Sequence, residues 1–289
     1  MKYRYMERET EKYRIEFMSK ELEISRSSYY AWHSRPKGRL WNENMYLSQR
    51  IRSIYEQKKQ RYGSPRITAE LRSEGFSCSR NRVARLMRKQ GITARARKRF
   101  RVLTNSNHKL AVAENLVEMQ FNPEKANSLW TTDITYIRTR EGWLYLAVVL
   151  DLWSRSVISW RADRNMDENL VIKPLEKAIR DRQPGGELIL HSDRGSQYAS
   201  QRLRQILKEN NITQSMSSKG NCYDNAPVES FFSTLKRELI YRESYKTREE
   251  AKQSLFQYIE VFYNRQRRHS SLGYISPMQF ENLNKITPN

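Results

Sequence analysis

Three acidic residues occupy positions that suit metal-assisted chemistry. Asp133 lies within the strand-like segment Leu129-Trp-Thr-Thr-Asp-Ile-Thr-Tyr-Ile137. Asp193 follows a short apolar run that ends at Leu190, and Glu229 lies in the first turns of an amphipathic helix. If a central sheet brings the three carboxylates together, they offer the hard oxygen ligands that Mg²⁺ prefers. These residue types therefore predict a site for divalent cations.

Attack on a phosphodiester is the chemistry that needs such a site, because negative charge shields the phosphorus. Two Mg²⁺ ions about 3.5–4 Å apart can activate the attacking oxygen and neutralise the leaving oxygen. Mg²⁺ keeps water and substrate oxygens among its ligands, so three carboxylates suffice. We therefore expect Asp133, Asp193 and Glu229 to be both the catalytic residues and the metal ligands.

The charge of the chain favours a polyanionic substrate. Among 289 residues, 53 are Lys or Arg and 32 are Asp or Glu, which gives a formal net charge of +21. Nucleic acid is the first expectation for such a chain. A membrane partner is disfavoured because no apolar run approaches the roughly 20 residues that span a bilayer. The length allows two domains.

The cysteines and histidines indicate neither a disulfide framework nor a zinc finger. Cys78 and Cys222 lie far apart, and the four histidines do not combine with them at zinc-ligand spacing. This cysteine usage indicates a reducing compartment, and the N-terminus lacks the apolar core of a secretory signal. We expect a cytoplasmic protein, and we assign no role to Cys222.

The N-terminal third is predicted to be all helical. Residues 1–40 form a helical segment that is broken near its end by proline and glycine. Residues 41–94 contain a longer helix from about Asn42 to Lys59, followed by a helix-turn-helix. We expect its first helix to begin with Ser64 as the cap and its second helix to run from Arg80 to Gln90. This arrangement places a recognition helix in the DNA major groove.

A run of cations covers the outer face of that second helix and continues into a basic linker, residues 95–125. No acid lies between Arg82 and Arg101. We expect this clustered charge to contact DNA, although a basic face on a basic protein can also be simply solvated. The expected contacts are Arg82, Arg85, Arg88, Lys89, Arg95, Arg97, Lys98, Arg99 and Arg101.

Residues 126–245 change to a pattern of strands and form the predicted core. Strict alternation around Asp133 turns its side chain away from the face of Trp130 and Ile134. Two further apolar strands with short links should complete an antiparallel meander. A helix, a strand that ends near Leu190, a second helix and a short last strand then form a βαβ unit. This order predicts an α/β fold, with a mixed sheet flanked by helices.

The helix that carries Glu229 closes the core. Asp224 and Asn225 are its candidate caps, and Glu229 and Lys236 project from almost the same side because seven residues are nearly two turns. Lys236 is expected to contact a DNA phosphate, with an ordinary solvated lysine as the alternative.

Residues 246–289 are expected to form a C-terminal helix and a basic tail. The aromatic residues of this helix, Tyr258, Phe262 and Tyr263, are better explained as core than as base-stacking groups. The arginines that follow, Arg265, Arg267 and Arg268, are either DNA contacts or part of a solvated turn.

Five segments together resemble one family, the DDE transposases of bacterial insertion sequences, and in particular the second-reading-frame catalytic product. Four belong to the core: Trp130-Thr-Thr-Asp-Ile-Thr-Tyr136, His191-Ser-Asp-Arg-Gly-Ser-Gln-Tyr198, Asn225-Ala-Pro-Val-Glu-Ser-Phe-Phe232 and Tyr263-Asn-Arg-Gln-Arg-Arg-His-Ser-Ser-Leu272. A fifth, Arg61-Tyr-Gly-Ser-Pro-Arg-Ile-Thr68, resembles the upstream helix-turn-helix. The 35 residues between Asp193 and Glu229 match the DDE triad of transposases and retroviral integrases.

This resemblance implies a ribonuclease-H-like core with a five-stranded mixed sheet and two Mg²⁺ ions, for which Mn²⁺ can substitute. It implies nicking of double-stranded DNA at the element ends and attack by the freed 3′-OH on a target strand. It also implies a homo-oligomer on DNA, a dimer or higher, a possible upstream-frame helix-turn-helix partner, and location on the bacterial nucleoid. Retroviral integrases carry a zinc domain for which this sequence lacks the ligands.

The sequence also allows alternative site residues and alternative functions. Asp151 also follows a core strand, although the residues after it are more typical of a turn. Asp224 is better explained as a helix cap. His191 either orients Asp193 or is a hydrogen-bonded structural histidine. A ribonuclease-H-like nuclease would share the acids without strand transfer, and a DNA-binding repressor would need no acids at all.

Overall fold

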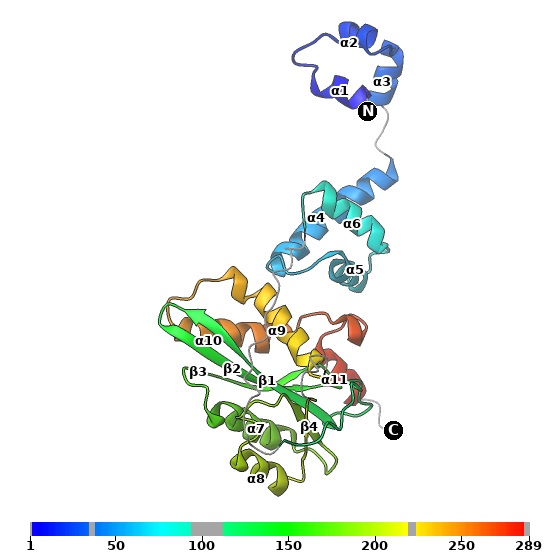
Figure 1. Ribbon diagram of the computed structural model, residues 1–289. Coiled ribbons are helices and arrows are strands. Elements are labelled where there is room, and N and C mark those ends of the chain that lie inside the picture. Colours follow the sequence, from blue (N-terminus) through cyan, green and yellow to red (C-terminus); the bar gives the residue numbers. More distant parts are fainter. Residues whose placement is uncertain (1, 35–37, 94–111, 219–223, 286–289) are drawn as a thin grey trace. The chain divides into compact units, whose positions relative to one another are not determined.

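The computed structural model describes residues 2–34, 38–93, 112–218 and 224–285. They belong to two compact units, Met1–Ala94 and Arg95–Asn289, and each is described by itself (Figure 1). Across the described ranges, no helix has both the length and the apolar character needed to cross a membrane.

The first unit begins with three short helices around a small aromatic core. They are α1 (Lys2–Arg8), α2 (Ile15–Glu21) and α3 (Arg26–Ser34). Met6, Met18 and Tyr29 are buried together at their centre. Tyr3 stacks on Trp32 with 5.4 Å between ring centroids, which joins the first helix to the third.

Three further helices of this unit contact one another: α4 (Arg39–Gln57), α5 (Ser64–Ser73) and α6 (Arg80–Lys89). The α5–α6 pair confirms the expected helix-turn-helix. Ser79 caps α6, because its hydroxyl accepts a 3.2 Å hydrogen bond from the backbone N–H of Arg82. The prediction that Ser64 is the N-cap of α5 was wrong by one residue. Gly63 is the cap, since Ser64 is already helical and Pro65 lies in the first turn.

The second unit is built on one mixed sheet of five strands in the order β3-β2-β1-β4-β5. The first three strands, β1 (Leu129–Thr139), β2 (Gly142–Asp151) and β3 (Val157–Asp163), form an antiparallel meander. The last two, β4 (Ile189–Ser192) and β5 (Thr213–Met216), run parallel to β1. This topology confirms the mixed five-stranded sheet that the sequence predicted.

Helices cover both faces of the sheet (Figure 1). On one face, α7 (Glu168–Arg182) contacts β2 and β3, and α8 (Gln201–Glu209) contacts β5. On the other face, α9 (Ala226–Glu238) contacts β1, and α10 (Arg248–Phe256) contacts β1 and β2. Apolar side chains of the even-numbered β1 face, such as Trp130, are buried under α7 and α8. The odd-numbered face, which carries Asp133, therefore looks toward α9.

The C-terminal region contains the expected helix, although the second half of that helix is π-helical. A capping box between Thr247 and Glu250 starts α10, but the chain continues as the π-helical turns η2 (Gln257–Tyr263). The 3₁₀ turns η1 (Ile240–Arg242) and η3 (Ser270–Leu272) precede and follow this region, and α11 (Pro277–Lys285) comes last. Tyr258, Phe262 and Tyr263 are buried, which confirms that they belong to the core.

Candidate active site

The pairing of β1 with β4 brings two of the acids side by side. In this parallel ladder Thr131 is the partner of His191, and Thr132 is the partner of Ser192. The next residue on each strand is an acid, Asp133 on β1 and Asp193 just past the end of β4. Neighbouring strands lie about 4.8 Å apart. The two carboxylates therefore start from adjacent positions at the edge where β4 ends.

Backbone hydrogen bonds hold both aspartates. The Asp133 carboxylate accepts a 2.7 Å bond from the N–H of Ile134, and the Asp193 carboxylate accepts a 2.9 Å bond from the N–H of Gly195. A Cβ atom at position 195 would lie 3.1 Å from that same Asp193 oxygen. Glycine thus lets the loop fold tightly around the carboxylate.

Helix α9 brings the third acid to the same place. Glu229 lies in its first turn and is half-buried. The start of the helix is fixed by a buried 2.8 Å hydrogen bond, in which the Thr131 hydroxyl donates to the side-chain oxygen of Asn225. Because Thr131 precedes Asp133 by two residues on the same face, this bond aligns α9 with the acid-bearing part of β1.

Burial and neighbouring negative charge raise the pKa of two of the three acids, Asp133 and Glu229. Burial raises the pKa of Asp133 well above its usual range, and the charges of Asp193 and Glu229 raise it further. Burial and the charge of Asp193 also raise the pKa of Glu229. Gathered negative charge of this kind is relieved by a divalent cation, and carboxylate oxygens are its preferred ligands. The donor set therefore fits Mg²⁺ or Mn²⁺.

The carboxylates are electrostatic neighbours without forming a compact cluster. Among the residues that the structure describes, no group of three or more His, Cys, Asp or Glu side chains has the arrangement of an assembled metal site. Tyr198 lies in the same neighbourhood. Its hydroxyl is 3.3 Å from that of Thr132, and burial, followed by the charges of Asp133 and Asp193, raises its pKa well above the usual value.

Lys236 extends from α9 toward the acids. It is buried, so the expectation of an ordinary solvated lysine is wrong. Its amine lies 4.8 Å from the centre of the Tyr136 ring, as in a cation–π contact. Burial lowers the pKa of Lys236 to about 8, while the negative charge of Asp133 acts in the opposite direction.

Asp151 and Asp224 have structural roles. Asp151 accepts hydrogen bonds from the backbone N–H groups of Trp153 at 2.9 Å and Asn127 at 3.2 Å, so it shapes the turn after β2 as its sequence indicated. The expectation that Asp224 caps α9 is wrong. Its carboxylate instead accepts bonds from the N–H of Ser218 at 2.7 Å and from the side chain of Asn115 at 3.0 Å.

His191 is a buried, hydrogen-bonded histidine. Its Nδ1 lies 2.9 Å from the hydroxyl of Ser215, and its Nε2 lies 3.4 Å from that of Ser217. Burial lowers its pKa. These bonds join β4 to β5 and the residues that follow it, which favours the structural alternative. Cys222 lies outside the described residues.

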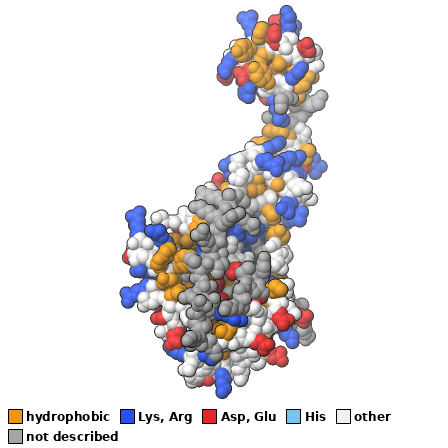
Figure 2. All heavy atoms as spheres, viewed as in Figure 1, with side chains coloured by type: hydrophobic (Ala, Val, Ile, Leu, Met, Phe, Trp, Pro, Cys, Tyr) orange, Lys and Arg blue, Asp and Glu red, His pale blue; other side chains and the backbone are white. Residues whose placement is uncertain are grey.

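The cations of the helix-turn-helix divide into two groups. Arg85, Arg88 and Lys89 are exposed on α6. Figure 2 shows Lys and Arg side chains gathered on this helical region. Arg82 is instead half-buried, and its guanidinium donates to Asn44 at 2.9 Å and to Glu43 at 3.2 Å, both on α4. The remaining predicted contacts lie outside the described residues: Arg95, Arg97, Lys98, Arg99 and Arg101.

The C-terminal arginines also differ from one another. Arg267 is buried and donates to both oxygens of Glu238, at 2.8 and 2.9 Å, so it is unavailable to DNA and that expectation is wrong. Arg268 is half-buried and donates to the carbonyl of Tyr274 at 2.8 Å. Arg265 alone of the three is exposed.

Sequence reasoning did not single out Tyr198, Gly195 or the Thr131–Asn225 bond. Their positions in the sequence could have indicated two of them, since Gly195 and Tyr198 follow Asp193 within the same short motif. Their roles depend on contacts across the sheet, which spacing along the chain does not reveal.

Comparison with known proteins gives three family matches. Residues 42–100 match the HTH-like domain, and residues 123–222 and 229–284 each match an integrase core domain. Among curated relatives, the transposase InsF for insertion sequence IS3A of Escherichia coli (strain K12) is 43% identical over 287 residues, covering 98% of this chain and 99% of the relative. The insertion element IS600 uncharacterized 31 kDa protein of Shigella sonnei is 41% identical over 257 residues, covering 89% and 94%.

Solved structures give weaker likenesses. The simian T-cell lymphotropic virus intasome in complex with the PP2A regulatory subunit B56 gamma matches with a TM-score of 0.49 and 16% identity, covering 82% of this chain and 76% of that chain. The HTLV-2 integrase catalytic core domain in complex with magnesium matches with a TM-score of 0.43 and 16% identity, covering 55% and 99%. The relationship of the chain to known proteins therefore rests on the sequence matches.

Proposed function

Because the chain belongs to the family of insertion-sequence transposases that includes InsF of IS3, we propose that it cuts DNA at the ends of an insertion element and joins the freed 3′-OH to another strand. The aligned region covers 99% of that relative and 98% of this chain. Its formal charge of +21 suits a protein that holds two long duplexes.

Asp133, Asp193 and Glu229 are the proposed catalytic residues and metal ligands. The observation that carries this assignment is the β1–β4 register, which sets Asp133 beside Asp193, together with the charge of Glu229, which contributes to the raised pKa of Asp133. Two Mg²⁺ ions, or Mn²⁺ in their place, would activate the attacking oxygen and neutralise the leaving oxygen. The three side chains would hold these ions and orient the scissile phosphate between them.

Cationic side chains would position the DNA. Lys236 lies on the same helix as Glu229 and is proposed to contact a phosphate next to the one that reacts. Arg85, Arg88 and Lys89 of α6 are proposed to contact the element end, and Arg265 the flanking backbone. We also propose that the chain acts on DNA as a homo-oligomer, together with an upstream-frame helix-turn-helix protein, at the nucleoid.

An assay on a labelled element-end duplex with Mg²⁺ separates the candidate functions. Joined product is expected for a transposase. Cut product without joining would instead identify a ribonuclease-H-like nuclease, and retarded but intact DNA would identify a repressor.

Replacing one acid tests the site. Glu229→Gln should lower both cutting and joining by at least about a thousandfold, because several kcal/mol of transition-state stabilisation depend on the metal ions. DNA binding measured by gel retardation should persist. Glu249→Gln is a matched control, since Glu249 also lies in the first turn of a helix, α10, but is exposed. Near-normal joining by Glu229→Gln would refute the assignment.

A further inference from the structure

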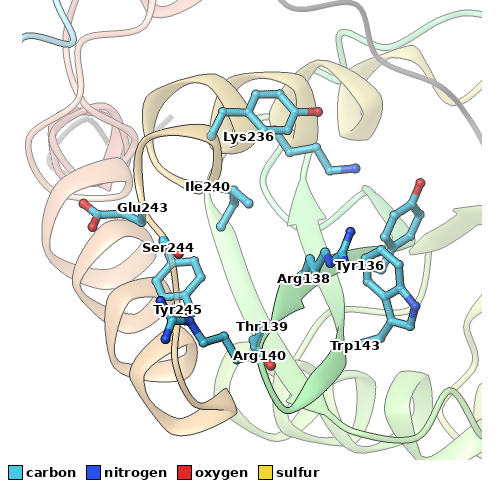
Figure 3. A pocket seen from close by; sticks show the side chains of 11 residues that line it. Tyr136, Arg138, Thr139, Arg140, Trp143, Lys236, Ile240, Glu243, Ser244 and Tyr245 are labelled. Atoms are coloured by element: carbon cyan, nitrogen blue, oxygen red, sulfur yellow. The ribbon is translucent and has the colours of Figure 1, made fainter.

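A pocket of about 900 Å³ opens between the β1–β2 hairpin and the segment that leads from α9 into α10 (Figure 3). Tyr136, Arg138 and Trp143 line it from the hairpin, and Lys236 and Tyr241 line it from the opposite side. Ligand pockets in proteins commonly have volumes of roughly 300–1,000 Å³. This one is therefore large enough for a nucleotide.

Hydrogen bonds tie the two walls of the pocket together. The backbone N–H of Arg140 donates to the carbonyl of Tyr245 at 3.1 Å, and the Arg248 guanidinium donates to the carbonyl of Trp143 at 3.0 Å. Gly142 forms the turn of the hairpin with a φ of +112°, a value that side chains rarely permit. The pocket is thus held open by the fold itself.

The lining combines positive charge with aromatic surface. Among the described residues that line the pocket, Arg138, Arg140 and Lys236 are cationic and Glu243 is the one acid. Trp143 and Tyr241 are each 46% exposed, so part of each ring surface is open to a ligand. A cationic wall beside exposed aromatic rings is the combination that binds nucleic acid strands, because phosphates pair with the cations and bases stack on the rings.

Lys236 links the aromatic wall to the site of the acids, because Tyr136 and Arg138 lie on the face of β1 opposite to Asp133. The Tyr136 ring meets that of Trp143 nearly at right angles, with 5.1 Å between centroids, and its face is covered by Lys236. The charge of Lys236 in turn acts on Asp133. A strand rises about 3.3 Å per residue, so Tyr136 and Arg138 lie roughly 10 and 17 Å along β1 from Asp133.

We propose that this pocket receives one unstacked nucleotide of the DNA strand held at the carboxylates, with its base against Trp143 and its phosphate beside Arg138 and Arg140. One strand of duplex DNA advances about 3.4 Å per nucleotide, which places this nucleotide about three to five positions from the scissile phosphate. The inference rests on the proposed function and adds a nucleotide-binding subsite to it.

Binding of a fluorescein-labelled single-stranded oligonucleotide to the full chain, followed by anisotropy without Mg²⁺, tests the subsite apart from catalysis. The probe is compared with a strand of the same length that lacks its bases. The wild-type chain should bind the strand with bases about tenfold more tightly, because the stacking of one base contributes a free energy of about that size. Trp143→Ala should remove most of this preference, and Trp143→Phe should keep it, because phenylalanine still stacks.

Phe256→Ala is the control, since Phe256 on α10 is 50% exposed and lies outside the pocket lining. Retention of the wild-type preference by Trp143→Ala would overturn the proposal, as would a wild-type chain that binds both strands equally. Joining assays report separately on the proposed function. A wild-type chain that joins DNA normally but shows no base preference would refute the subsite alone, and a wild-type chain with the base preference but no joining would refute the transposase mechanism alone.

An abasic site moved along the element-end duplex tests the position. Joining by the wild-type chain should fall when the site is about three to five nucleotides from the cleaved bond. For Trp143→Ala, an abasic site at these positions should not lower joining any further. Sensitivity confined to other positions would contradict the assigned register.

Discussion

Asp151, which is buried, and Asp133, which is half-buried, show how the same residue type serves different purposes. Burial raises the pKa of both Asp133 and Asp151. Asp151 accepts two backbone N–H groups, whereas Asp133 accepts one and faces two other acids. A carboxylate with backbone donors at both oxygens has its hydrogen-bonding needs met within the fold. The repulsion between Asp133 and the other two acids is instead relieved best by a bound cation.

Asp151→Asn should change how stability depends on pH. In the folded chain the pKa of Asp151 is raised, so the carboxyl holds its proton to a higher pH than in the unfolded chain. Its ionisation therefore lowers the free energy of unfolding as pH rises from the ordinary aspartate value through the folded value. The variant should lack this loss. Urea unfolding of both proteins across the acidic range measures it, and parallel pH profiles would contradict the account. Cutting and joining should survive the substitution.

At the scale of elements, a buried ion pair joins α9 to the chain after the π-helical turns. The Arg267 guanidinium pairs with Glu238 at 2.8 Å, and Glu238 also accepts a 2.9 Å bond from the hydroxyl of Tyr258. Phe231 and Tyr263 pack edge to face nearby, with 4.8 Å between ring centroids. Because Glu229 lies on α9, these contacts set the direction in which the third acid points.

Arg267→Met should destabilise the second unit by about 3–5 kcal/mol, because it leaves the Glu238 charge buried without its partner. Arg265→Met, two residues earlier and exposed, should change the free energy of unfolding by no more than about 0.5 kcal/mol. Urea denaturation compares the two. Equal free energies of unfolding for the two variants would show that the ion pair between Arg267 and Glu238 does not stabilise the fold. Adding Glu238→Gln to Arg267→Met should restore part of the loss.

The elements differ in how far the sequence predicts them. Alternation around Asp133 and the apolar run before Asp193 indicated the strands correctly, because a half-buried strand imposes a period of two on its residues. The partner of Arg267 could not be predicted, since Glu238 lies 29 positions away and no local pattern links them. The same holds for Asp224, which resembled a cap but bonds to Asn115. Motif and spacing in the sequence are enough to predict the three acids as one site, whereas the pocket near them depends on contacts between the hairpin and the region of α9.

The molecule as a whole consists of two units with different surface chemistry. The first presents exposed cations on α6, and the second carries the acids at the end of β4. On the proposed function, phosphate contacts govern affinity for DNA, while the acids govern bond making and breaking. Substitutions in the two units should therefore affect different steps.

Neutralising α6 should weaken binding without altering the chemical step. Arg85→Gln combined with Arg88→Gln should reduce the slope of log affinity against log salt by about 0.9 per lost phosphate contact. The cutting rate at saturating protein should stay near that of the wild type. Lys173→Gln with Arg180→Gln removes two cations from α7, in the second unit, as a control. An unchanged salt slope in the α6 variant would contradict DNA contact by this helix.

Manganese anomalous scattering from crystals of the full chain with an element-end duplex would locate the metal ions. We expect peaks for two ions, each about 2.1 Å from carboxylate oxygens, with Asp133, Asp193 and Glu229 all serving as ligands. Manganese bound only at other acidic residues, with these three carboxylates outside ligand distance, would contradict this expectation.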